Sequence, residues 1–183
     1  MESKHSLKRA KSECRQLGTV IGLALILALG VIAVWPWLRT AIWPHREIEL
    51  YFSKPEGLYL GSEVRKLNVK RQPLAWKAAA ALLDGPQSEK LKNSIPKGSK
   101  LLAVELEGKT AYVNLSEEFS ANIVDKRQEV LALYSIVNTL TGLPGIERVQ
   151  ILIEGEKRET LHGNVEISDP LKADHSLIVR AGD

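Results

Sequence analysis

The longest uncharged stretch of the chain constrains its fold more than any other feature. No residue from Gln16 to Leu38 carries a charge, and most of these residues are Leu, Ile, Val, Ala or Gly. As a helix rising 1.5 Å per residue, the segment would be about 34 Å long, enough to cross a hydrocarbon core of about 30 Å. We therefore predict a transmembrane helix over residues 16–38.

The flanks of this segment predict its orientation. Basic residues dominate the preceding tail, residues 1–15, and tryptophans, which prefer the membrane interface, cluster at the other end (Trp35, Trp37 and Trp43). By the positive-inside rule, the N-terminus is cytoplasmic, residues 39–46 are a linker, and residues 47–183 form an extracytoplasmic domain. We expect a single-pass protein of the cell membrane. A cleaved signal peptide is the alternative, but its apolar core is normally only about 7–15 residues long.

Charge and cysteine content argue against several function classes. Residues 40–183 carry 19 basic and 20 acidic residues, so this part is neutral and gives no indication of nucleic-acid binding. The single cysteine, Cys14, precedes the apolar stretch. The exported part therefore has neither a disulfide framework nor a cysteine-based zinc site.

Apolar periodicity predicts an α+β domain. Alternation indicates strands at about 48–53, 58–67 and 149–153 and a short strand at 176–179, whereas helical spacing indicates helices at about 73–84 and 126–141. We predict a largely antiparallel sheet covered on one face by two helices and preceded by the transmembrane helix.

A hairpin is expected over residues 100–115. With Gly108 and Lys109 at the centre of a two-residue type II′ turn, every cross-strand pair on one face is apolar. These pairs are Leu106 with Ala111, Val104 with Val113 and Leu102 with Leu115. A slip of one residue would turn this apolar set to water, so the register is strongly specified.

Residues suited to catalysis are few. His162 and His175 lie on predicted loops and could form a metal pair or part of a Ser-His-Asp set, but exposed loop residues are the favoured interpretation. Glu117 and Glu118 suggest the paired carboxylates of glycoside cleavage, yet adjacent strand residues point apart, so a solvated face or a helix start is favoured. We predict no catalytic residue, no bound metal and no cofactor.

Four residues are candidates for binding a partner. Lys90, Lys92 and Lys97 could contact an anionic wall polymer or lipid headgroups, although a solvated surface is the simpler interpretation. Asn138 lies beside the apolar stripe of the second helix, where it either bonds to neighbouring backbone or faces a partner.

Several phrases, in their order and spacing, resemble the GerMN domain, the sporulation and spore-germination module of Gram-positive bacteria. They are residues 82–86 (LLDGP), 94–102 (SIPKGSKLL), 110–116 (TAYVNLS), 134–140 (YSIVNTL), 149–155 (VQILIEG) and 159–163 (ETLHG). The resemblance spans about Ile48 to Ile178. It implies an extracytoplasmic domain without known catalytic activity, carried by membrane-attached proteins of spore-forming bacteria and similar to ring-building modules. This chain has one such domain, and an apolar anchor instead of a lipobox.

These observations favour a non-catalytic module of spore formation or germination. It would dock to another envelope or sporulation protein, or to itself, through a sheet edge or an exposed sheet face. A module that binds peptidoglycan or another polyanion is the second hypothesis, and a cell-wall hydrolase is the least favoured.

Overall fold

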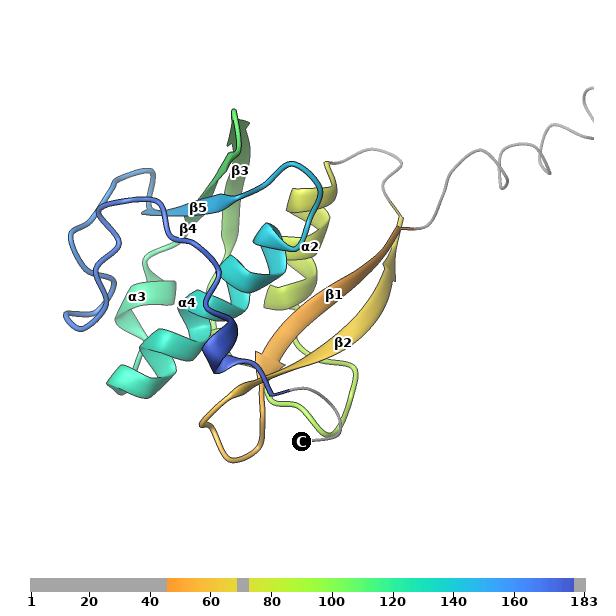
Figure 1. Ribbon diagram of the computed structural model, residues 1–183. Helices are drawn as coiled ribbons and strands as arrows, with labels where there is room; N and C mark the ends of the chain where they lie inside the picture. Colours follow the sequence, from red (N-terminus) through yellow and green to blue (C-terminus); the bar gives the residue numbers. More distant parts are fainter. Residues whose placement is uncertain (1–45, 69–72, 180–183) are drawn as a thin grey trace, which may run out of the picture. The chain divides into compact units, whose positions relative to one another are not determined.

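The computed structural model describes residues 46–68 and 73–179 (Figure 1). The predicted cytoplasmic tail and transmembrane helix, residues 1–15 and 16–38, lie outside the described residues. Within the described ranges, no helix is both long and apolar enough to cross a bilayer. These ranges contain two sheets and several helices, which confirms the α+β class.

The first sheet is an antiparallel ribbon of two strands. β1 (Arg46–Ser53) begins within the predicted linker and pairs along its whole length with β2 (Leu60–Leu67). The alternating residues Ile48, Leu50 and Phe52 are buried, as the sequence predicts. The turn between the strands closes with a hydrogen bond of 2.9 Å from the Gly57 N–H to the carbonyl oxygen of Lys54.

Helix α2 (Leu74–Leu83) follows Pro73, which is the N-cap and not the first helical residue. The buried face of the helix consists mainly of alanines, whose small side chains permit close packing: Ala75, Ala78, Ala79, Ala81 and Leu82.

The C-terminal end of α2 is held by an arginine from β2. The Arg65 guanidinium lies 5.7 Å from the centre of the Phe52 ring. It donates to the carbonyl oxygens of Ala81 at 3.1 Å and Gly85 at 2.9 Å, and it pairs with Glu63. Carbonyls at a helix end have no partner within the helix, so Arg65 fastens this end of α2 to the ribbon.

The predicted hairpin is confirmed, with one irregularity. β3 (Leu101–Glu107) pairs with β4 (Thr110–Leu115), and Leu106 and Val104 have their predicted partners. Gly108 has φ +57°, as the first central position of a type II′ turn requires. The register shifts between Leu101 and Ala103, so that Leu101, and not Leu102, lies opposite Leu115. A bulge with an extra residue in β3 explains this difference.

Two helices follow the hairpin. α3 (Glu118–Ala121) is a single short turn that agrees with the helix start considered for Glu117 and Glu118, and α4 (Lys126–Thr141) has the predicted bounds. The Asp125 side chain accepts from the Gln128 N–H at 2.8 Å, and the Gln128 side chain accepts from the Val124 N–H at 2.9 Å. This reciprocal capping explains why the helix begins at Lys126.

β5 (Arg148–Ile153) runs parallel to β4, which makes the second sheet mixed, with the order β3-β4-β5. Among the described residues, two of the three strand pairings are antiparallel, as predicted, but the prediction of a single sheet is wrong and the β4-β5 pair is parallel. The connection from β4 to β5 contains α4, and a helical crossover of this kind returns the chain in the same direction and so produces a parallel pair.

β1 and β2 do not join this second sheet. Side chains satisfy the outer edge of β1: Thr139 Oγ1 accepts from the Tyr51 N–H at 3.1 Å, and Ser94 Oγ accepts from the Ser53 N–H at 2.8 Å. These bonds replace those that another strand would make. α2 and α4 each contact both sheets and do not simply cover one face of a single sheet.

The predicted last strand at 176–179 is also wrong, because the segment is a turn of 3₁₀ helix, η1 (His175–Leu177). The Asp174 side chain accepts from the Ser176 N–H at 2.9 Å and thereby favours a helical turn over an extended strand. Between η1 and Val179, the last described residue, a single bridge between Leu60 and Ile178 resembles strand pairing.

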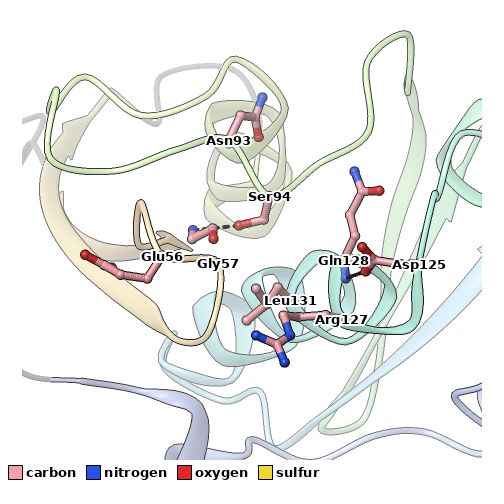
Figure 2. Close-up of a pocket in the computed structure, with 9 residues that line it drawn as sticks. Glu56, Gly57, Asn93, Ser94, Asp125, Arg127, Gln128 and Leu131 are labelled. Atoms are coloured by element: carbon pink, nitrogen blue, oxygen red, sulfur yellow. Dashed lines mark hydrogen bonds between the residues drawn. The ribbon is translucent and has the colours of Figure 1, made fainter.

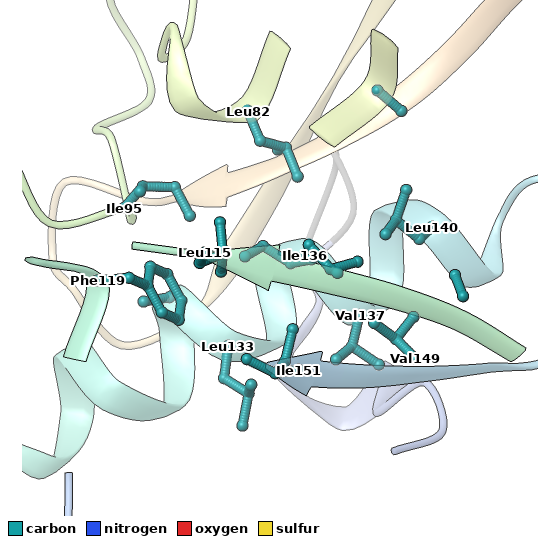
Figure 3. Close-up of a cluster of buried hydrophobic side chains, with 14 of the residues drawn as sticks. Leu82, Ile95, Leu115, Phe119, Leu133, Ile136, Val137, Leu140, Val149 and Ile151 are labelled. Carbon is teal, nitrogen blue, oxygen red and sulfur yellow. The ribbon is translucent and has the colours of Figure 1, made fainter. Parts of the chain in front are cut away.

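The hydrophobic core lies around α4 (Figure 3). Leu133, Ile136 and Leu140 of this helix are fully buried together with Val149 and Ile151 of β5. Because α4 is enclosed by both sheets and by the C-terminal segment, four of its polar residues are buried too: Glu129, Ser135, Asn138 and Thr139.

Candidate functional site

The helix-free face of the β3-β4-β5 sheet carries an open groove. Ala103 and Glu105 of β3, Tyr112 and Asn114 of β4 and Leu152 of β5 line a volume of about 540 Å³. The strand register places these residues on the face opposite the buried Ala111 and Val113. The groove offers an aromatic ring, an amide and a carboxylate, which suit recognition of another chain.

A second pocket lies at the N-terminus of α4 (Figure 2). Residues from the turn after β1, the 93–94 loop and the start of α4 line about 310 Å³. Its buried hydroxyl, Ser94, already accepts from the Ser53 N–H, and its Asp125 caps α4. These groups are engaged in the fold, and among the described residues that line the pocket there is no histidine or cysteine.

The three candidate lysines are exposed and do not form one patch. Lys90 lines a pocket of about 490 Å³ with Lys54, and Lys92 Nζ donates to the carbonyl oxygen of Pro55 on the same rim at 3.1 Å. Glu56 and Glu63 also line this pocket, so its charge is mixed. The Lys97 backbone instead contacts α3, through a bond of 2.9 Å from the Asn122 amide to its carbonyl oxygen.

Asn138 is buried and bonds to backbone. Its amide nitrogen donates to the carbonyl oxygen of Asp174 at 2.9 Å, and its amide oxygen accepts from the Asp174 N–H at 2.9 Å. One side chain thus fastens the C-terminal segment to α4, and both halves of the amide are used.

Glu129 is a buried carboxylate that the sequence analysis did not single out. It accepts from the N–H groups of His162 at 2.8 Å, Asn164 at 3.3 Å and Val165 at 3.0 Å, and from the Asn164 side chain at 2.7 Å. Burial raises the pKa of Glu129, but these four donors outweigh burial and hold the pKa below its ordinary value. A glutamate on the helix face of Leu133 and Leu140 was the signal that could have revealed it, because a buried charge requires partners.

The other titratable residues from the sequence analysis have separate structural roles. Glu117 pairs with Arg158, and this hydrogen bond lowers the pKa of Glu117, whereas Glu118 begins α3. His162 lies on the loop held by Glu129, and His175 begins η1. Within the described part of the chain, no three His, Cys, Asp or Glu residues are grouped to hold a metal ion.

The fold is an α+β domain in which polar side chains hold loops in place and one sheet face is accessible. A family model described as Germane, sporulation and spore germination, matches residues 49–159. The chain therefore belongs to this family, which confirms the resemblance found in the sequence.

Solved structures support the same fold. The tandem GerMN domains of the sporulation protein GerM from Bacillus subtilis match with a TM-score of 0.60 and 23% identity, over 69% of this chain and 46% of that one. The first GerMN domain of that protein matches with a TM-score of 0.60 and 25% identity, over 69% and 97%. A candidate lipoprotein from Clostridium perfringens matches with a TM-score of 0.50 and 28% identity, over 70% and 87%.

This chain thus spans less than half of the tandem protein and nearly all of its first domain. A comparison with curated proteins gives no match.

Proposed function

We propose that this chain is a non-catalytic, membrane-anchored module of spore formation or germination that acts by binding another protein of the cell envelope. The observation that carries the proposal is the open face of the β3-β4-β5 sheet, with its groove of about 540 Å³. The family and the predicted span over residues 16–38 support it. The buried carboxylate of Glu129 and the buried amide of Asn138 are both occupied by bonds that hold the fold together.

Site-specific photo-crosslinking in sporulating cells tests this proposal. A photoreactive residue replaces Tyr112, on the open face, in the full-length chain, and the matched control carries it at Val64, a strand position of β2 that is 68% exposed. We expect a specific envelope protein to be cross-linked from position 112 and not from position 64. Equal products from both positions, or none from position 112, would overturn the proposal.

Protease accessibility tests the proposed membrane topology separately. Protease added to intact protoplasts should digest the folded domain and spare the N-terminal tail, because the domain is proposed to lie outside the cell membrane. Protection of the domain until the membrane is opened would contradict an extracytoplasmic location.

Peptidoglycan or another polyanion is a second candidate partner. It is favoured by Lys54, Lys90 and Lys92 around one pocket rim. Binding of the full-length chain to purified cell wall should weaken with salt and should fall when Lys90 and Lys92 are changed to Gln. Lys97→Gln is the matched control, because Lys97 contacts a different segment; wall binding that is insensitive to all three changes rules the electrostatic mode out.

A further inference from the structure

β3 is an outer strand with exposed apolar side chains. Leu102 and Leu106 are 41% and 56% exposed, although they belong to the apolar side of the hairpin. Hydrogen-bonded and non-hydrogen-bonded pairs alternate along an antiparallel ladder, and Glu107 and Thr110 flank the two-residue turn. Val104 and Leu106 therefore direct their N–H and C=O groups away from β4. Among the described residues, none forms a backbone hydrogen bond to these outward groups.

The other outer strands are at least partly covered. Val149 of β5 donates to Leu171 at 2.9 Å and accepts from it at 2.8 Å. β1 is capped by the side chains of Thr139 and Ser94. The start of β2 accepts from Val179 through the carbonyl oxygen of Leu60 at 3.0 Å. Natural proteins cover sheet edges in this way to prevent unwanted pairing, so the open length of β3 stands out as an available edge.

We propose that β3 pairs antiparallel with β3 of a second copy of this chain, with Val104 opposite the partner's Val104. This inference rests on the proposed contact function and names one partner for it. The two-fold register places Leu102 opposite the partner's Leu106, so that the exposed leucines cover each other. Each Glu105 lies opposite the partner's Ala103, and the two Val104 residues exchange both backbone hydrogen bonds.

Charge and apolar pairing select this register over its neighbours. A two-fold axis at Glu105 would place the Glu105 carboxylate opposite the partner's Glu105. An axis at Leu106 would place Glu105 opposite the partner's Glu107. Like charges directly opposite each other destabilise a strand pair. An axis at Ala103 avoids this repulsion but places Leu106 opposite the partner's Lys100. Of these registers, only the one centred on Val104 pairs leucine with leucine without placing two glutamates opposite each other.

The pairing is expected to form at the membrane. One edge strand buries much less than the total of about 1,200–2,000 Å² that is typical of stable interfaces. Two copies of the domain that are free in solution would therefore bind each other only weakly. Two chains anchored in one bilayer gain a high effective concentration, which favours a weak, closed, two-fold contact without additional surface.

Disulfide cross-linking of the full-length chain in native membranes tests the register. In a Cys14→Ser background, Val104→Cys brings two thiols opposite each other across a hydrogen-bonded pair, where Cα atoms are about 5.5 Å apart. That separation suits a disulfide. We expect mild oxidation to give a covalent homodimer with Val104→Cys, about tenfold less with Glu105→Cys, and none with the control Val64→Cys. Equal cross-linking at positions 104 and 105, or no dimer from position 104, would overturn the register.

A second variant tests the apolar contact. Leu106→Lys, added to Val104→Cys, places a charge at the proposed edge contact. It should reduce the cross-linked fraction about tenfold, which corresponds to a loss of about 1.4 kcal/mol in the free energy of pairing. Val64→Lys in the same background replaces another exposed apolar side chain, on β2, and should leave the cross-linked fraction unchanged. If position 104 gives no homodimer while position 112 still captures an envelope protein, homotypic pairing fails and the proposed function stands.

Discussion

Replacing Glu129 should reveal how the long C-terminal loop is held. The residue has no exposed surface, and its carboxylate accepts three backbone N–H groups and one side-chain amide from residues 162–165. Glu129→Gln keeps the size and one acceptor oxygen but places an NH₂ group toward the Asn164 amide. Glu129→Ala removes the acceptor altogether.

The structure indicates the size of both effects. A hydrogen bond to a charged group contributes about 1.5–3 kcal/mol, and a neutral one about 0.5–1.5 kcal/mol. In Glu129→Gln the hydrogen bonds lose the contribution of the negative charge, but the cost of burying that charge disappears as well. The free energy of unfolding should therefore fall by about 2 kcal/mol. Glu129→Ala leaves several N–H groups without an acceptor, but residues 162–164 are exposed enough to be rehydrated, so its cost is about 3–4 kcal/mol.

The dependence on pH follows from the lowered pKa of Glu129. Because the pKa is lower in the folded than in the unfolded protein, the stabilisation is complete above the unfolded value of about 4.3. It is lost as the pH falls through the folded value. The stability difference between wild type and Glu129→Gln should therefore shrink below about pH 4.

Urea unfolding of the full-length chain in detergent, followed by circular dichroism from pH 3 to pH 7, measures these differences. Hydrogen exchange at residues 161–165 should accelerate in both variants at neutral pH. Glu105→Gln, an exposed glutamate on the open sheet face, is the matched control and should change stability by less than about 0.5 kcal/mol. Wild-type stability and wild-type exchange in Glu129→Gln at pH 7 would refute the role of the buried carboxylate.

Three further substitutions have defined outcomes. Asn138→Ala removes both bonds to the Asp174 backbone, so the free energy of unfolding should fall by about 1–3 kcal/mol and limited proteolysis should begin near residue 174; an unchanged digest would contradict this anchor. Arg65→Ala leaves the mostly buried Glu63 without its cation, so the free energy of unfolding measured in urea should fall by about 3 kcal/mol; a much smaller loss would contradict this role of Arg65. Arg158→Ala removes a solvent-accessible pair with Glu117 and should lower the thermal midpoint only slightly, whereas a large drop would show a structural role for the pair.

The local elements of this domain were predictable because their causes lie within a few residues. Alternation along residues 48–53 identified β1, and helical spacing along residues 126–141 identified α4. The glycine at 108 and the apolar pairs of the hairpin predicted most of its register. The family resemblance was visible for the same reason, since its phrases coincide with these local elements.

The candidate site was less predictable. Asn138 was identified as a polar residue beside an apolar stripe, but its partner lies 36 residues away at Asp174. Glu129 was not predicted as a site residue because most of its hydrogen-bond donors are backbone N–H groups of a distant loop. Every residue type except proline has such a group, so the sequence of the loop does not indicate them. The lysine-rich stretch appeared continuous in sequence, yet folding directs Lys90 and Lys97 to different segments.

The sequence by itself determined most of the segments that become strands and helices and where most of these begin and end. Tertiary structure decided that β5 lies parallel to β4, that β1 and β2 form a separate sheet, and that Leu106 remains exposed at an open edge. The physical reason is the range of the forces involved: capping and periodicity act between near neighbours, whereas strand partners and burial depend on which distant surfaces exclude water together.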